Sequence, residues 1–265
     1  MDHLLVIRFD IVAAYSKGFW CKNSRWATIA GMTFADYLFK RRHFDRLIIT
    51  LCVRWYVRYK LSYRDLVEMM AERGLSMAHT TIRRWVVKFV PVFEQRWRKY
   101  STPVGRSWRV DETSIKVKGE WVYLYRAVDK AGQTVDFYLS AHRDVAAAKA
   151  FFRKAIFHNG TPQKITLDGY HASHRAVKDL QEEAVIPADT LLRTCQYLNN
   201  IIEQDHRGIK SRTGLMLGFK RFDHATIVIS GIELAQKIKK GQFNLQCLRK
   251  RAGDVHDLWM ATLMA

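Results

Sequence analysis

Apolar residues recur at three- and four-residue steps between residues 44 and 59, a spacing that predicts a helix with one buried face. The buried set predicted on this basis is Phe44, Leu47, Ile48, Leu51, Cys52, Trp55 and Tyr59. Ser62 and Asp65 stand three residues apart and form a start signal for a second helix. That helix is expected to bury Tyr63, Leu66, Val67 and Met70, and Gly74 then permits a turn.

A third helix is predicted after Ser76. Its apolar positions, available to a core, are Ile82, Trp85, Val86 and Phe89, and its outer positions are His79, Thr80, Thr81, Arg83 and Arg84. Two helices joined by a short turn, the second with a basic outer face, are typical of a helix-turn-helix motif, whose second helix enters the major groove of DNA. The five outer residues are therefore the predicted recognition set. A small helical bundle with a solvated charged face remains an alternative for this segment.

The pattern changes after a junction that we place at Pro91 and residues 96–103. Alternating and apolar runs then predict strands, in contrast to the helical periods before them. The predicted strands are 107–118, 121–128, 134–140, 164–167 and 191–197; the predicted helices are 145–157, 173–184, a segment that contains Glu203, and 226–240. The order of these elements is that of a ribonuclease-H-like α/β fold. The expected fold class is thus an α/β domain preceded by an all-α helix-turn-helix domain.

The composition supports folded domains with a polyanionic partner. The chain has 265 residues, of which 48% are hydrophobic and 12% aromatic, so it is not a disordered tail. Its formal net charge is +19 and its pI is about 10.0. Residues 32–100 hold 15 Lys and Arg against 6 Asp and Glu, and residues 205–251 hold 11 against 3. A ribosome, an RNA or an anionic membrane could also bind such a charge, although charge alone favours nucleic acid. The sequence contains no apolar run of about 20 residues, so we predict no membrane span.

Cysteine and histidine spacing offers no metal-binding or disulfide framework. The four cysteines lie far apart and form no C-x-x-C pair. A reducing cytosol fits this usage best. His171 and His174 form an H-x-x-H pair, but further ligands at suitable spacing are absent from the sequence, and we assign the pair no role.

Three acidic residues suggest the chemistry. Asp111 and Asp168 end strand-like runs, Glu203 lies in a helix-like run, and Lys210 follows Glu203 by seven residues. In-line attack on a phosphodiester is served by two divalent cations about 3.5–4 Å apart, and hard cations take carboxylate oxygens. Strands only about 4.8 Å apart can bring such carboxylates together. The pattern therefore predicts a site for two Mg²⁺ ions, whose ligands would also suit Mn²⁺.

The residues next to Asp111 and Glu203 must be considered as alternative ligands. Successive strand side chains point to opposite faces, so Asp111 and Glu112 cannot both enter one site, and the pattern does not decide between them. In the helix, Asp205 lies about 200° around the axis from Glu203, whereas Lys210 returns to within about 20° of it. Lys210 is therefore placed to hold a DNA phosphate beside the carboxylates.

Several motifs in order resemble the insertion-sequence-six family of bacterial DDE transposases. The resemblance runs from about Met32 to about Phe243 and includes the segments 54–56, 61–66, 81–86, 123–129, 135–140 and 217–220. Asp168 follows Asp111 by 57 residues and Glu203 follows Asp168 by 35, and the latter spacing is the family's own. The resemblance implies a catalytic Asp111, Asp168 and Glu203, with Lys210 as the trailing basic residue. It also favours Asp111 over Glu112.

The same resemblance implies a function. Such a protein would bind the terminal inverted repeats of its element, expose 3′ hydroxyls there with water as the nucleophile, and use them to attack target DNA. It would act in the bacterial cytoplasm as a homodimer or larger assembly, with no membrane partner. Its transposition would be replicative and would form cointegrates. Two alternatives are a DNA-binding regulator with an inert catalytic domain and a ribonuclease-H-like nuclease that acts on another nucleic acid.

Domain boundaries are expected at 1–31, 32–100, 101–221 and 222–265, as an N-terminal extension, a helix-turn-helix domain, a catalytic domain, and a C-terminal helix with a tail. Residues 1–31 lack the basic start and continuous apolar stretch of a secretory signal. Because the family resemblance begins near Met32, we expect natural translation to start there. Mass spectrometry of protein expressed from its own upstream sequence would test this, and an N-terminus at Met1 would contradict it.

Overall fold

The computed structural model describes residues 34–195, 200–215, 219–246 and 255–264. These residues fall into two compact units. The first unit covers the chain as far as Arg42 and contains helix α2 (Phe34–Phe39). The second begins at His43 and contains every element described below. The predicted extension 1–31 and the proposed start at Met32 lie outside the described residues.

Three helices open the second unit: α3 (Arg46–Arg58), α4 (Tyr63–Ala71) and α5 (His79–Arg98). The predicted start of α4 is observed as a capping box, in which the Ser62 hydroxyl accepts from the backbone N–H of Asp65 and the Asp65 carboxylate accepts from that of Ser62. Gly74 follows with a φ of +73°, a conformation that suits glycine and ends the helix. α5 buries the four apolar residues predicted for it.

Two expectations for this region were wrong. Leu47 and Tyr59 are each 48% exposed, whereas α3 buries Ile49, Thr50, Cys52, Val53, Tyr56 and Val57. The buried face is shifted because α3 packs against both α5 and α9 (Phe222–Lys239), and one apolar stripe cannot serve two neighbours. The junction was placed from Pro91, yet α5 continues through Pro91 to Arg98. Burial of Phe93 and Trp97 beyond the proline offsets the hydrogen bond that a helical proline removes.

The sheet has five strands in the order β3-β2-β1-β4-β5. These are β1 (Ser107–Val117), β2 (Glu120–Asp129), β3 (Thr134–Ser140), β4 (Lys164–Leu167) and β5 (Leu191–Thr194). The first three pair antiparallel, and β4 runs parallel to both β1 and β5. The strands, with α6 (Val145–Asn159), α7 (His171–Glu182) and α8 (Asn200–Leu215), occur in the predicted order. The ribonuclease-H-like α/β prediction is confirmed.

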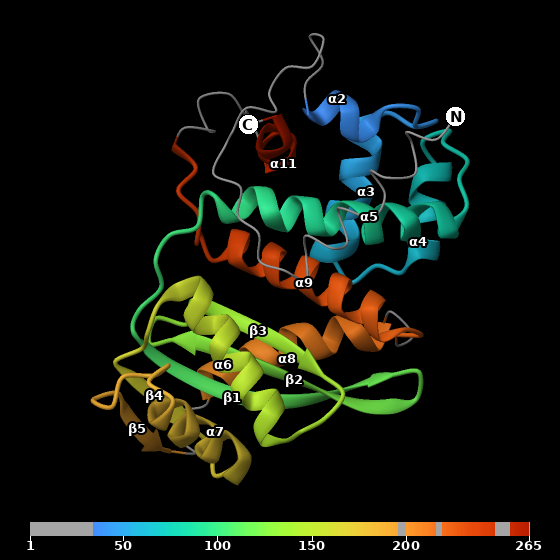
Figure 1. Ribbon diagram of the computed structural model, residues 1–265. Coiled ribbons are helices and arrows are strands. Elements are labelled where there is room, and N and C mark those ends of the chain that lie inside the picture. Colours follow the sequence, from blue (N-terminus) through green and yellow to red (C-terminus); the bar gives the residue numbers. More distant parts are fainter. Residues whose placement is uncertain (1–33, 196–199, 216–218, 247–254, 265) are drawn as a thin grey trace, which may run out of the picture. The chain divides into compact units, whose positions relative to one another are not determined.

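The two faces of the sheet carry different helices (Figure 1). One face packs against α6 and α7 in a core that contains Trp108, Val110, Tyr125, Phe151, Phe152, Val177 and Leu180. On the other face, α8 packs against β1 and β2, and α9 packs against β3. A separate helix, α11 (Val255–Met264), places Trp259 against Phe93 of α5.

Helix α9 lies between the sheet and the helical layer of α3 and α5 (Figure 1). It is buried on all sides from Val228 to Ala235, as expected of a helix with neighbours all round. On the sheet side, the guanidinium of Arg126 pairs with the carboxylate of Glu233 at 2.7 Å, and both side chains are almost fully buried. Among the described helices, none combines the length and apolar character that a membrane span requires.

Candidate active site

Asp111 and Asp168 lie next to each other on two neighbouring strands. Asp111 is in β1, and Asp168 is the first residue after β4. The parallel register pairs Arg109 with Thr166, so continuing it by two residues sets Asp168 opposite Asp111. Both residues are partly exposed. Two carboxylate-bearing residues therefore meet at the edge of the sheet where β4 ends.

The packing of β1 separates Asp111 from Glu112, which the sequence could not do. Asp111 stands opposite Arg126 in the antiparallel register, so the two residues lie on the same face. That face carries α8 and α9, because Arg126 pairs with Glu233 of α9. Glu112 therefore faces α6 and α7. The helix that contains Glu203 is α8, so Asp111 and Glu203 belong to the same side of the sheet.

Glu112 is nonetheless part of the site's surroundings. Its side chain is 1% exposed, and its carboxylate accepts hydrogen bonds from Arg143 at 3.0 Å and from the Ser173 hydroxyl. Burial raises the pKa of Glu112, with a further rise from the nearby charge of Asp168, while the bonds from Ser173 and Arg143 counteract it. A buried carboxylate thus connects β1, the loop after β3 and the first turn of α7.

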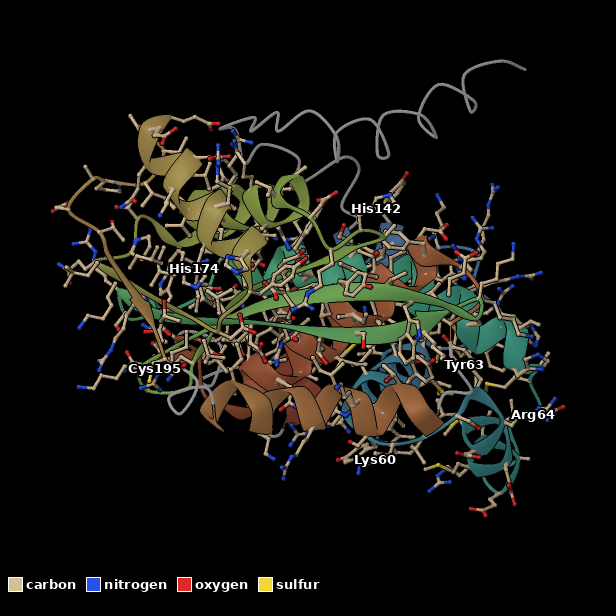
Figure 2. The ribbon with its side chains drawn as sticks, turned by 90° about the horizontal axis from the view of Figure 1, so that it is seen from below. Lys60, Tyr63, Arg64, His142, His174 and Cys195 are labelled. Atoms are coloured by element: carbon tan, nitrogen blue, oxygen red, sulfur yellow. The ribbon has the colours of Figure 1, made fainter. Side chains whose placement is uncertain are left out.

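The turn after Asp168 is held by the same region. The Asp168 carboxylate accepts from the backbone N–H of Tyr170 at 3.1 Å, and its carbonyl accepts from His174 Nε2 at 2.7 Å. Figure 2 shows His174 reaching from α7 toward this turn. The Tyr170 hydroxyl donates to the carbonyl of Arg143 at 2.7 Å, and the Arg143 guanidinium lies 3.7 Å from the centre of the Tyr170 ring. Asp168 is therefore fixed through both its side chain and its backbone.

Sequence reasoning missed this supporting group of Glu112, Arg143, Tyr170, Ser173 and His174. Glu112 was set aside because only one of Asp111 and Glu112 can enter the site and the family resemblance favoured Asp111. His174 was set aside because its pair with His171 lacked further ligands. The available signal was position: Tyr170, Ser173 and His174 all follow Asp168 within six residues. Residues so close to a strand-end carboxylate are well placed to orient it.

Glu203 and Lys210 both belong to α8, which packs against β1. The side chain of Glu203 lies outside the described part of the structure. Lys210 is exposed, seven residues further along the same helix. Among the side chains that the structure describes, no three His, Cys, Asp or Glu residues gather closely enough to hold a metal. Among the predicted carboxylates with described side chains, the continued register places Asp111 and Asp168 at neighbouring positions, and both offer the oxygen atoms that hard cations bind.

The predicted recognition residues lie in the first turns of α5. His79, Arg83 and Arg84 are exposed, and Thr80 and Thr81 are half-buried. The structure therefore leaves a basic surface at the N-terminal end of the helix, immediately after the Gly74 turn.

Comparison with known proteins identifies a family model and several similar transposases. A family model described as a DDE domain, of the IS240 transposase type, matches residues 105–242. The chain is 39% identical over 209 residues to the transposase for insertion sequence-like element IS431mec of Staphylococcus aureus, covering 78% of this chain and 92% of that one. It is 38% identical, over the same length, to the transposase for insertion sequence element IS257 in transposon Tn4003.

Solved structures with partial similarity include two retroviral enzymes. The integrase catalytic core domain of HTLV-2, in complex with magnesium, gives a TM-score of 0.39 at 16% identity and covers 49% of this chain and 84% of that one. The catalytic core domain of BIV integrase gives 0.38 at 15% identity, with 49% and 83% covered.

Proposed function

This chain belongs to the insertion-sequence-six family of DDE transposases, polynucleotidyl transferases of bacterial insertion sequences, and on that premise we propose the reaction it carries out. It binds the terminal inverted repeats of its element, nicks them to expose 3′ hydroxyls, and transfers those ends into target DNA. The transposition is replicative and forms cointegrates. The observation that carries the proposal is the parallel pairing of β1 with β4, whose register, continued past the end of β4, sets Asp168 opposite Asp111.

We assign Asp111, Asp168 and Glu203 as the ligands of two Mg²⁺ ions. The donor set fits, because carboxylate oxygens are the ligands that Mg²⁺ prefers and Asp111 shares its side of the sheet with α8. Mn²⁺ would be accepted by the same ligands. When bound, the metals activate the attacking oxygen and stabilise the leaving oxygen.

The chain's own residues supply position and charge. Asp168 keeps its orientation because Tyr170 and His174 hold its carboxylate and carbonyl. Asp111 is on β1, the central strand of the sheet, and strands hold functional residues more precisely than loops do. The backbone position of Asp111 is therefore well fixed. Lys210 is exposed on α8 and contacts a phosphate of the bound strand as a point charge.

Sequence-specific binding is assigned to α5. His79, Thr80, Thr81, Arg83 and Arg84 would meet base edges and phosphates in the major groove of the terminal repeat. The net charge of +19 supports a DNA partner. Because two ends must be held at once for transfer, the active form is a homodimer or a larger homo-oligomer.

The test is strand transfer in vitro. Purified protein, Mg²⁺, a labelled duplex ending in the element's terminal repeat and a supercoiled plasmid would be incubated, with Glu203→Gln and Asp111→Asn run alongside. We expect joined product from the wild type and a loss of at least about a thousandfold in each variant, since each removes a metal-binding carboxylate. Omission of Mg²⁺ should abolish the product.

Each contrary result would overturn a different part of the proposal. Tight repeat binding without product would favour a regulator with an inert catalytic domain. Cleavage of an RNA:DNA hybrid in preference to terminal repeats would favour a nuclease. Retention of full transfer by Glu203→Gln would overturn the assignment of Glu203.

A further inference from the structure

The hairpin that joins β1 and β2 extends past the edge of the sheet at which Asp111 and Asp168 meet. β4 ends at Leu167, opposite Val110 when the register is continued, whereas β1 runs on to Val117. Figure 1 shows this hairpin reaching beyond α6 and α7. At about 3.3 Å per residue, Lys116 lies roughly 17 Å along the strand from Asp111. That is about half a turn of duplex DNA.

The two faces of the hairpin differ sharply. Ile115, Val117, Val122 and Leu124 are between 0% and 6% exposed, on the face against which α8 packs. On the opposite face, β2 carries an aromatic row whose exposure rises toward the tip: Tyr125 is fully buried, Tyr123 is half-buried, and Trp121 is 56% exposed. The hairpin is thus anchored through one face and presents an uncovered tryptophan on the other.

A lysine lies over the ring of this tryptophan, and another lysine lies in the adjacent turn. Lys116 is the cross-strand partner of Trp121, and its Nζ lies 4.9 Å from the centre of the indole ring. Lys118 and Gly119 form the turn, with φ values of +54° and +88°. Glu120 pairs with Val117 and so belongs to the opposite face.

A second segment braces the tip and adds charge. The backbone N–H of Lys118 donates to the carbonyl of Phe219 at 2.6 Å, and Val117 forms a parallel bridge with Phe219. The next residue, Lys220, is exposed. Arg221 follows but pairs with Asp223. Lys116 therefore lies against Trp121, and Lys118 and Lys220 are on the adjoining backbone, which is held from two directions.

We propose that this hairpin face, made of Trp121, Lys116, Lys118 and Lys220, is a binding surface for the sugar-phosphate backbone of double-stranded DNA about half a turn of duplex away from the candidate site. The lysines contact successive phosphates, and the indole ring packs on the deoxyribose between them. The proposal rests on the proposed function and adds a contact made by the catalytic domain itself.

Charge complementarity selects this occupant, because the exposed end of the face offers cations around one aromatic ring. The acidic residue of β1 on the same face, Glu112, is buried and paired with Arg143, so it does not repel a phosphate at the tip.

The test is binding of a labelled 40-base-pair duplex, measured by fluorescence anisotropy between 50 and 200 mM salt. The variants are Lys116→Gln/Lys118→Gln and Trp121→Ala. Controls are Lys130→Gln/Lys178→Gln, which removes two exposed lysines elsewhere, and Phe157→Ala, which removes another exposed aromatic side chain, 71% exposed. Removing one lysine that binds a phosphate should flatten the slope of log K against log salt by about 0.9.

We expect the Lys116→Gln/Lys118→Gln variant to lower the salt dependence so that the ratio of affinities at 50 and 200 mM falls by roughly tenfold. Trp121→Ala should weaken binding about threefold, with less change in slope, and Trp121→Phe should restore most of it. The controls should bind like the wild type. Strand transfer should fall in parallel with binding.

Unchanged affinity and slope in the lysine variant would overturn the inference, while leaving the transposase function intact. If the wild type bound no duplex at all, the proposed function would fail instead. Light scattering gives the remaining distinction: loss of binding that accompanies loss of the oligomer would assign this face to contact between copies and would also overturn the proposal. The glutamine variant keeps the β-hairpin's buried face, so its fold serves as the reference if Trp121→Ala is unstable.

Discussion

At the scale of single residues, Glu112 is a buried carboxylate that touches the segment holding Asp168 without facing Asp111. It accepts from Ser173 and Arg143, and Arg143 in turn contacts Tyr170. We therefore regard Glu112 as a positioning residue for Asp168. Its own oxygens are occupied by these donors, so it is not assigned as a metal ligand.

Glu112→Gln should lower strand transfer about tenfold to a hundredfold and raise the Mg²⁺ concentration needed for half-maximal rate, because supporting contacts orient metal-binding groups. DNA binding should be unchanged. Since burial raises the pKa of Glu112, the wild-type carboxylate gains its proton at a higher pH than an ordinary glutamate. The rates of the two proteins should therefore converge as the pH falls. Glu182→Gln, on the exposed side of α7, is the matched control; equal Mg²⁺ dependence in all three proteins would contradict the assignment.

Asp136 provides a second residue-scale prediction, on stability. Burial alone would raise its pKa, but Lys154 at 3.0 Å and His158 at 2.7 Å outweigh it and hold the pKa below its usual range. A lowered pKa in the folded state means that the stabilisation is complete above the ordinary pKa of about 4 and is lost as the pH falls below it. Asp136→Asn should cost about 3 kcal/mol near neutral pH.

The measurement for Asp136 is urea unfolding of wild type and Asp136→Asn from pH 7 down to pH 3. The difference in free energy of unfolding should be constant at the upper end and should shrink below about pH 4. A difference that stays the same throughout would show that the ionised carboxylate contributes nothing specific. Asp189→Asn, at an exposed site with no resolved ion pair among the described residues, is a suitable reference.

At the scale of elements, α9 passes close to both α3 and α5 at one glycine. A Cβ added at Gly231 would lie 2.7 Å from Val57 Cγ1 and 3.0 Å from Val90 Cγ1. Alanine is otherwise preferred to glycine inside a helix by about 1 kcal/mol. Here the overlap with two fully buried valines should dominate, because packed neighbours have little room to move.

Gly231→Ala is therefore expected to destabilise the protein by about 1–3 kcal/mol, measured by chemical unfolding. Ser230→Ala on the same helix is the control and should have a smaller effect, since its hydroxyl bonds only within the helix. Combining Gly231→Ala with Val57→Ala should recover part of the loss. A stabilised Gly231→Ala protein would show that α9 can move away from α3 and α5.

At the scale of the whole molecule, the helices and the sheet are joined through a buried ion pair. Arg126 of β2 and Glu233 of α9 lie between the layers, and Arg212 of α8 donates to the carbonyl of Val57 in α3 at 2.7 Å. The first contact joins the sheet to α9, and the second joins α8 to α3, which packs against α5. Helix α5 and the candidate site therefore belong to one packed body within residues 43–263.

Glu233→Gln should destabilise the molecule by about 3 kcal/mol, because it removes the carboxylate charge that pairs with the buried guanidinium of Arg126. The double variant Arg126→Met/Glu233→Met should recover most of this loss, since apolar side chains of similar volume can replace a buried pair. Thermal unfolding followed by circular dichroism would measure both. If the double variant were as unstable as Glu233→Gln, the attraction between Arg126 and Glu233 would itself stabilise the fold. That result would contradict the expected replacement by apolar side chains.

The sequence by itself determined the elements and their order. Periods of 3.6 and 2 residues are local properties, and they predicted α4, α5, all five strands and α6 to α9 in sequence. The spacing of Asp111, Asp168, Glu203 and Lys210 is likewise a property of the chain alone, and all four residues lie within the stretch 105–242 that the DDE family model matches. What these residues do at the site remains a prediction until the strand-transfer experiment is made.

Only the tertiary structure decided which face each residue occupies. Alternation predicts that Asp111 and Glu112 point to opposite faces of the sheet. Only the packing of α8 and α9 on one face, and of α6 and α7 on the other, decides which residue faces which helices. The same is true of Leu47, of the helix that continues through Pro91, and of Trp121 at the uncovered end of a strand. The physical reason is that burial depends on packing against residues distant in sequence. Local periodicity contains no information about which distant element packs against a given face.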